Sequence, residues 1–169
     1  DVAHLALPDE VQVQSSDADA GGPLGRVASR QVTPPIGVVD AAVEIIAGSR
    51  RPMIIVGHGA RNDMAEIIAL AEHIGAPVAT TFKVKGAISD QHELGCGVLG
   101  RSGTPIASWF MNESDLLIVF GASFSNHTGI APYKTTIQVD DDPMALGRLQ
   151  PVDVPVLGDV GATAAALAA

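Results

Sequence analysis

The sequence predicts an α/β domain built on a doubly wound parallel sheet, and three strand-like segments carry this prediction. Residues 53–56, 116–120 and 136–139 are apolar runs, and each leads into a turn of small or acidic residues. Strands that are apolar on both faces are typical of parallel sheets covered by helices. In such sheets the loops at the carboxyl ends of the strands form the ligand crevice. We therefore expect a nucleotide-sized site at that edge, although the three segments alone reveal no reaction.

Helical and strand-like stretches alternate along the chain, as βαβ units require. Helically spaced apolar residues predict a helix over 36–48, and Asp63 with Glu66 predicts a capping box for a helix that ends at Gly75. The other expected elements are strands at 77–81 and 154–157, an irregular segment over 83–103 with a short strand near Val98, helices at 104–111, 143–149 and from 160 on, and a loop over 121–135 with one helical turn.

The composition limits the class of protein. A chain of 169 residues with 47% hydrophobic residues can form one domain with a full core. The net charge of −9 argues against a nucleic-acid surface, because phosphate binding needs clustered Lys and Arg. No apolar run is long enough to span a bilayer, so no membrane partner is expected. Cys96 is the only cysteine, which excludes an intrachain disulfide and suits the cytoplasm.

The first 35 residues differ from the rest of the chain. A strand-like run over 2–7 stops at Pro8, and residues 15–25 are rich in Ser, Asp, Ala and Gly, which is linker composition. The chain also begins at Asp1 without a methionine, so we expect a cut or processed piece. The prediction is the tail of a preceding domain plus a linker over 1–35, followed by a domain over 36–169. An ordinary N-terminal arm is the alternative.

Two glycine-containing loops are candidate anion sites. Gly57-His58-Gly59 follows a strand, and the small residues would let a phosphate or adenine approach the backbone. The six-residue G-x-G-x-x-G pattern is incomplete, so a tight turn without a ligand is equally compatible. Residues 97–105 resemble an anion-binding loop in which Arg101 could pair with a phosphate. This loop lacks the G-K-[ST] ending of a P-loop, so ATPase chemistry is unsupported.

The acidic run Asp140-Asp141-Asp142 follows a predicted strand. A carboxylate at a strand end can accept hydrogen bonds from ribose hydroxyls. Helix capping and solvated charge are the favoured alternative for Asp141 and Asp142. No metal site is expected, because EF-hand spacing and H-x-x-x-H pairs are absent from the sequence. No catalytic residue is expected either, since a Cys–His pair through Cys96 has no third orienting group.

Taken together, residues 36–169 resemble the central domain of thiamine diphosphate-dependent enzymes, most closely the acetolactate synthase and pyruvate oxidase group. The resemblance implies a Rossmann-like six-stranded parallel sheet of the DHS-like NAD/FAD-binding type, with helices on both faces. Five of the strands are visible in the sequence. It also implies that residues 1–35 are the tail of a pyrimidine-binding domain plus a linker. The matching words are RPMIIVGHG at 51–59, IGAPV at 74–78, KVKG at 83–86, LGRSGT at 99–104, SDLLIVFG at 114–121, IQVDDDP at 137–143 and DVPVLGD at 153–159.

The resemblance implies a three-domain enzyme whose catalytic parts lie outside this chain. Thiamine diphosphate and Mg²⁺ would bind there, because the family's G-D-G…N-N motif is absent from this sequence. The intact enzyme would act on 2-oxo acids as a lyase or transferase, with the cofactor supplying the chemistry. Its partners would be its own other domains and further copies of itself. This piece alone is expected to be inactive.

The resemblance also implies a cofactor site that holds FAD in some members and ADP or nothing in others. This chain has Ala122–His127 where flavin-binding acetolactate synthases carry an R-F-D-D-R-type word, so all three states remain open. The rival functions are a free-standing NAD- or FAD-binding oxidoreductase or electron-transfer domain, and a purely structural module. The positions that match the family's cofactor-binding residues are Gly57, His58, Gly59, Thr80, Thr81, Lys83, Gly100, Arg101, Ser102, Gly103, Gly121, Ala122, Ser123, Asp140, Asp159 and Val160.

Overall fold

The computed structural model describes residues 4–19, 21–22, 24–28 and 31–169, and the chain divides into two compact units, Asp1–Arg30 and Gln31–Ala169. Among its described residues, the first unit has a short helix, α1 (Asp9–Gln12), without a buried residue. Of the strand-like run expected over 2–7, residues 4–7 are exposed and form no strand, and residues 2 and 3 lie outside the described residues. The domain boundary expected after residue 35 concerns the longer protein and stays a prediction.

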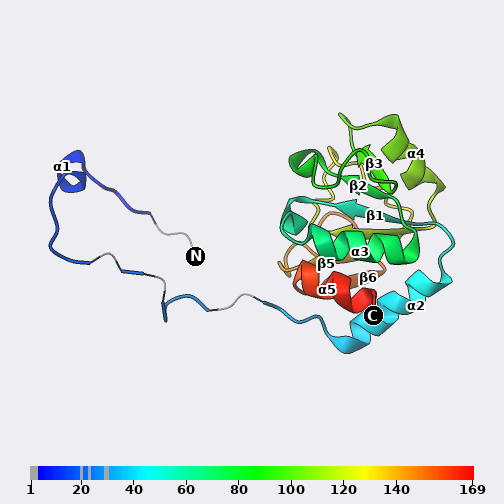
Figure 1. Cartoon of the computed structure of the whole chain (residues 1–169), viewed down its shortest axis with the longest axis horizontal. Helices are drawn as coiled ribbons and strands as arrows, with labels where there is room; N and C mark the ends of the chain where they lie inside the picture. Colours follow the sequence, from blue (N-terminus) through cyan, green and yellow to red (C-terminus); the bar gives the residue numbers. More distant parts are fainter. Residues whose placement is uncertain (1–3, 20, 23, 29–30) are drawn as a thin grey trace. The chain divides into compact units, whose positions relative to one another are not determined.

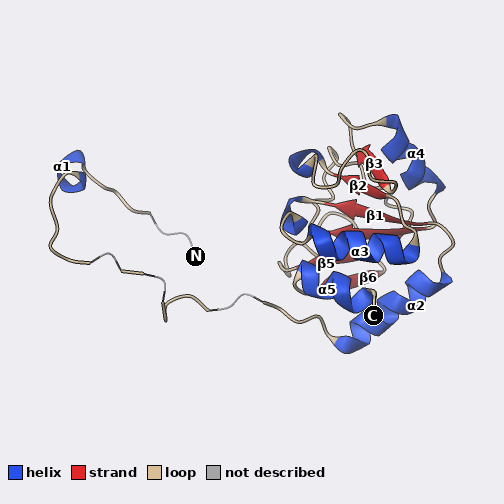
Figure 2. Ribbon diagram, in the orientation of Figure 1, coloured by secondary structure: helices blue, strands red, loops and turns tan. Residues whose placement is uncertain are grey.

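The second unit is built on six parallel strands in the order β3-β2-β1-β4-β5-β6 (Figures 1 and 2). This arrangement confirms the α/β Rossmann-like sheet. The sixth strand is the short one expected near Val98. The strands are β1 (Pro52–Val56), β2 (Val78–Thr80), β3 (Gly95–Val98), β4 (Leu116–Phe120), β5 (Thr135–Asp140) and β6 (Val154–Leu157).

Helices cover both faces of the sheet. One face packs against α2 (Ile36–Gly48), α3 (Met64–Ile74) and α5 (Val160–Leu167), which lie side by side in Figure 1. The other face packs against α4 (Pro105–Glu113) and the loop that follows β4. Every residue of β4 is buried, with Ile118 and Phe120 in the first core and Leu117 and Val119 in the second. The apolar runs of the sequence are therefore strands with two buried faces.

Two local predictions are wrong. Asp63 stands at the N-cap of α3 but its side chain makes no capping bond, so no capping box forms; it lies against α5, where a Cβ on Gly161 would be 2.9 Å from its Oδ1. Residues 143–149 form turns in place of the expected helix. The Gln138 side chain donates to the Ala145 carbonyl (3.0 Å) and accepts from the Gly147 amide (2.8 Å), which occupies backbone groups that a helix would use.

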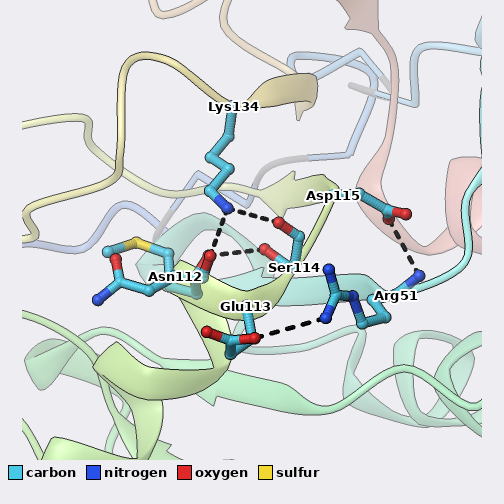
Figure 3. Close-up of polar contacts among 7 residues, drawn as sticks. Arg51, Asn112, Glu113, Ser114, Asp115 and Lys134 are labelled. Carbon is cyan, nitrogen blue, oxygen red and sulfur yellow. Dashed lines mark hydrogen bonds and ion pairs between the residues drawn. The ribbon is translucent and has the colours of Figure 1, made fainter.

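Side chains tie together the edge of the sheet where the strands begin (Figure 3). The Asp115 carboxylate accepts from the amides of Arg50 (2.9 Å) and Arg51 (3.0 Å) and from the Ser49 hydroxyl. The Ser49 bond is the main cause that lowers the pKa of Asp115 to about 2. The Lys134 ammonium donates to carbonyls at the end of α4. The starts of β1, β4 and β5 are thus joined by charged hydrogen bonds.

Candidate functional site

The strand order reverses between β1 and β4, and the turns that follow these two strands pack against each other. The Gly59 amide donates to the Gly121 carbonyl (2.9 Å). A Cβ on Gly57 would overlap the Gly121 carbonyl and the Cα of Ala122, and Gly121 has a positive φ of 54°. These glycines are therefore required for the contact between the two turns. In open α/β sheets ligands bind at this switch point.

A cavity of about 530 Å³ opens at this edge of the sheet. Its walls come from the 3₁₀ turn η1 (His58–Ala60), the 3₁₀ turn η2 (Phe82–Val84), the loop after β3 and the loop after β4. Seven of the residues expected to contact a cofactor line it together, namely His58, Thr81, Lys83, Arg101, Ser102, Gly121 and Ser123.

The polar groups of the cavity suit an anion. Lys83 and Arg101 supply two cations, and among the described lining residues no side chain is a carboxylate, although the chain carries a net charge of −9. Neither cation forms an ion pair with another described residue. Five hydroxyl groups add further hydrogen-bonding partners. A phosphate or diphosphate group needs this combination of cations and donors. The hydroxyls belong to Thr81, Ser102, Ser123, Ser125 and Thr128.

The loop after β4 forms one wall of the cavity and supplies lining residues that were not predicted from the sequence. The Ser125 carbonyl accepts from the amides of Thr128 (2.9 Å) and Gly129 (3.1 Å), which forms the single turn expected there. The His127 carbonyl accepts from the Arg101 amide (3.1 Å), and Gly100, with φ of 121°, leaves no room for a Cβ beside it. Six lining residues were not among the predicted cofactor positions, although two of them, Val98 and Leu99, belong to the candidate anion loop over 97–105; the six are Phe82, Val98, Leu99, Ser125, His127 and Thr128.

Asp140 and Ala122 line a second, smaller cavity of about 190 Å³ between the ends of β4 and β5. The two cavities share Gly121 and Ser123, so the turn after β4 separates them. Burial raises the pKa of Asp140, whose carboxylate accepts from the Asp142 amide (3.1 Å). Arg148 is the cation of this second cavity.

The remaining predicted residues lie in the framework around the cavities. Asp159 caps α5, because its Oδ1 accepts from the Ala162 amide (2.9 Å), and its own amide donates to the Val32 carbonyl (2.7 Å). Val160 is part of the buried core, and Thr80 is buried in β2. The residues that line neither cavity are Gly57, Gly59, Thr80, Gly100, Gly103, Asp159 and Val160.

Other chemistries have little support in the described part of the chain. No group of three His, Cys, Asp or Glu residues there could hold a metal ion. Burial raises the pKa of the Cys96 thiol to about 11, which makes it a poor nucleophile. No described helix is long and apolar enough to cross a membrane.

Comparison with known proteins identifies a family. A family model described as the central domain of thiamine pyrophosphate enzymes matches residues 39–167. The chain is 36% identical over 167 residues to a probable acetolactate synthase large subunit of Methanococcus aeolicus, a match that covers 92% of this chain and 28% of that protein. It is 39% identical over 131 residues to an acetolactate synthase of Mycobacterium bovis, covering 73% of this chain and 21% of that protein.

A solved structure supports the same fold. It is the X-ray structure of a putative thiamin diphosphate-dependent enzyme from Mycobacterium smegmatis, with a TM-score of 0.70 and 24% identity, covering 85% of this chain and 29% of that one. The chain therefore spans less than a third of the length of these relatives. These matches do not favour a free-standing oxidoreductase domain. By sequence and by fold, the chain belongs to the family of thiamine pyrophosphate enzyme central domains, and it is similar to those of acetolactate synthases.

Proposed function

We propose that this domain serves a thiamine diphosphate-dependent enzyme that acts on 2-oxo acids as a lyase or transferase. The names of the acetolactate synthase relatives support this assignment. Thiamine diphosphate and Mg²⁺ would bind to the enzyme's other domains, because the described residues offer no metal-ligand cluster. Cytoplasmic location and assembly of the whole enzyme into oligomers belong to the same proposal. The domain alone would be inactive, because the catalytic groups would belong to the other domains.

Within that enzyme, the domain binds a nucleoside diphosphate group, either ADP itself or the ADP part of FAD. The observation that carries this proposal is the cavity at the strand-order switch, which has cations and hydroxyls but no carboxylate among its described lining residues. Lys83 and Arg101 come from successive loops, so both can approach one diphosphate group. Arg101 can donate two parallel hydrogen bonds to it, and Lys83 acts as a point charge.

Two further residues fit the rest of a nucleotide. Phe82 lines the same cavity and is 70% exposed as a residue, which leaves its ring available for an adenine or flavin to stack on. Asp140 lies across the turn after β4 and would accept from ribose hydroxyls. The cavity volume lies within the range of ordinary small-molecule sites. The R-F-D-D-R-type motif of flavin-binding acetolactate synthases is absent from this sequence. ADP is therefore the first ligand to test and FAD the second.

The test is calorimetric titration of the chain with ADP and, separately, with FAD. Arg101→Ala and Lys83→Ala should each weaken ADP binding about tenfold or more, because each removes a charge-assisted hydrogen bond. Their free energies of unfolding should stay within about 0.5 kcal/mol of the wild type, since neither side chain is paired in the described structure.

The controls match the charge change at residues that do not line the cavity. Lys85→Ala alters an exposed lysine two residues from Lys83, and Arg26→Ala alters an arginine of the first unit. Both control variants should bind ADP as the wild type does. If neither ADP nor FAD binds at millimolar concentration, the domain is a structural module and the nucleotide proposal fails.

A further inference from the structure

Two histidines line the cavity in addition to Lys83 and Arg101. His58 belongs to η1, directly after β1, and His127 belongs to the loop after β4. The His127 carbonyl is held by the Arg101 amide, so this part of the loop lies against the arginine that we assign to the phosphate. The two histidines therefore line one cavity from different walls, together with the cations that we assign to the anion.

The charged groups around these imidazoles are cations. Lys83 from η2 and Arg101 from the loop after β3 share the cavity, and the Arg61 guanidinium donates to the His58 carbonyl (3.0 Å). No carboxylate is among the described lining residues of this cavity. Asp63 lies against Gly161 of α5, and Asp140 lies in the second cavity beyond the turn after β4.

A bound anion would add negative charge to the cavity that these two histidines line. Histidine is the side chain that ordinarily changes charge between pH 5 and 8. An anion favours the protonated form of an imidazole beside it, and by linkage the protonated form then binds the anion more tightly. We infer that His58 and His127 make anion binding at this cavity proton-coupled, so that protons are taken up on binding and affinity rises as the pH falls. This inference rests on the proposed function of the same cavity.

The test uses sulfate, which stays a dianion from pH 5.5 to 8 and so contributes no titration of its own. Sulfate affinity of the chain should increase about tenfold from pH 8 to pH 6. Calorimetry near pH 7 in two buffers of different ionisation enthalpy should show net proton uptake. The double variant His58→Gln/His127→Gln should bind sulfate with the same affinity at both pH values and take up no protons.

A matched control removes a histidine outside the cavity. His73 is exposed in the last turn of α3, and His73→Gln should keep the full pH dependence. Circular dichroism and thermal melts at both pH values check that the double variant is folded. Single variants His58→Gln and His127→Gln replace the double variant if it is unfolded, and each should lose part of the proton uptake.

The outcomes separate the two proposals. Sulfate and ADP binding that is independent of pH between 6 and 8, or a pH dependence that the double variant retains, overturns the proton coupling and leaves the nucleotide site standing. Failure of sulfate, ADP and FAD to bind at pH 6 and at pH 8 removes the nucleotide site and the coupling together.

Discussion

The two edges of the sheet differ in how their charged side chains are used. Where the strands begin, Asp115 and Lys134 are occupied by backbone groups of neighbouring segments (Figure 3). Where the strands end, Lys83 and Arg101 line a cavity and pair with no other described residue. Satisfied charges hold a fold together, whereas unpaired charges in a concave site are available to a ligand. We therefore assign a structural role to the edge where the strands begin and a binding role to the edge where they end.

Glycines are an exception to this division, because they are structural even at the binding edge. Gly57→Ala should destabilise the domain by roughly 3 kcal/mol or more, since the new Cβ would overlap the backbone of Gly121 and Ala122. Urea unfolding of the two proteins measures the difference. Gly48→Ala is the control, because a Cβ there meets nothing within 4 Å, and it should be neutral within about 0.5 kcal/mol. Equal stability of Gly57→Ala and wild type would show that the turn contact is unimportant.

The structural role of Asp115, at the edge where the strands begin, can be tested by the pH dependence of stability. Its pKa in the folded chain is about 2, below the ordinary value, so its contribution to stability is complete above about pH 4 and is lost as the pH falls through about 2. Asp115→Asn should cost about 1 kcal/mol at pH 7, a modest figure because the carboxylate is exposed to screening by water. The difference from wild type should vanish near pH 2 in thermal melts. A difference that persists there contradicts the assignment.

Asp140 should behave in the opposite sense. Burial raises its pKa in the folded chain, so ionisation costs stability as the pH rises above the value in the unfolded chain. Asp140→Asn should therefore be as stable as wild type at pH 7 or more stable by up to about 0.5 kcal/mol, while ADP affinity falls about fivefold. Melts and titrations of the same preparations measure both effects. A clear loss of stability would place Asp140 among the structural residues.

The sequence was sufficient for the parts of the fold that depend on local pattern. The fully buried β4 and the Thr104 cap of α4, which accepts from the Ala107 amide (3.3 Å), follow from short motifs. The helix expected over 143–149 does not form, because the side chain of Gln138 in the neighbouring strand hydrogen-bonds to backbone groups of this segment. No local pattern reports a competing partner of that kind.

In the candidate site, too, some residues follow from patterns in the sequence, whereas others depend on contacts between distant segments. Thr81 and Ser123 were among the positions that the family resemblance implied, and both line the cavity at the carboxyl ends of the strands. His127 was missed because its contact with Arg101 joins loops whose meeting depends on the strand order. Phe82 follows Thr81 directly and could have been found from that adjacency alone. Asp159 has a helix-capping role that its position before α5 would also have indicated.

The most direct test of the division between the edges is an amide ¹H–¹⁵N NMR spectrum of the chain, with and without ADP. We expect ADP to shift the signals of residues 81–83, 100–102 and 121–128 at the cavity. The signals of residues 49–51 and 113–116 at the opposite edge should stay unchanged. Shifts confined to the opposite edge, or none at saturating ADP, would contradict the account.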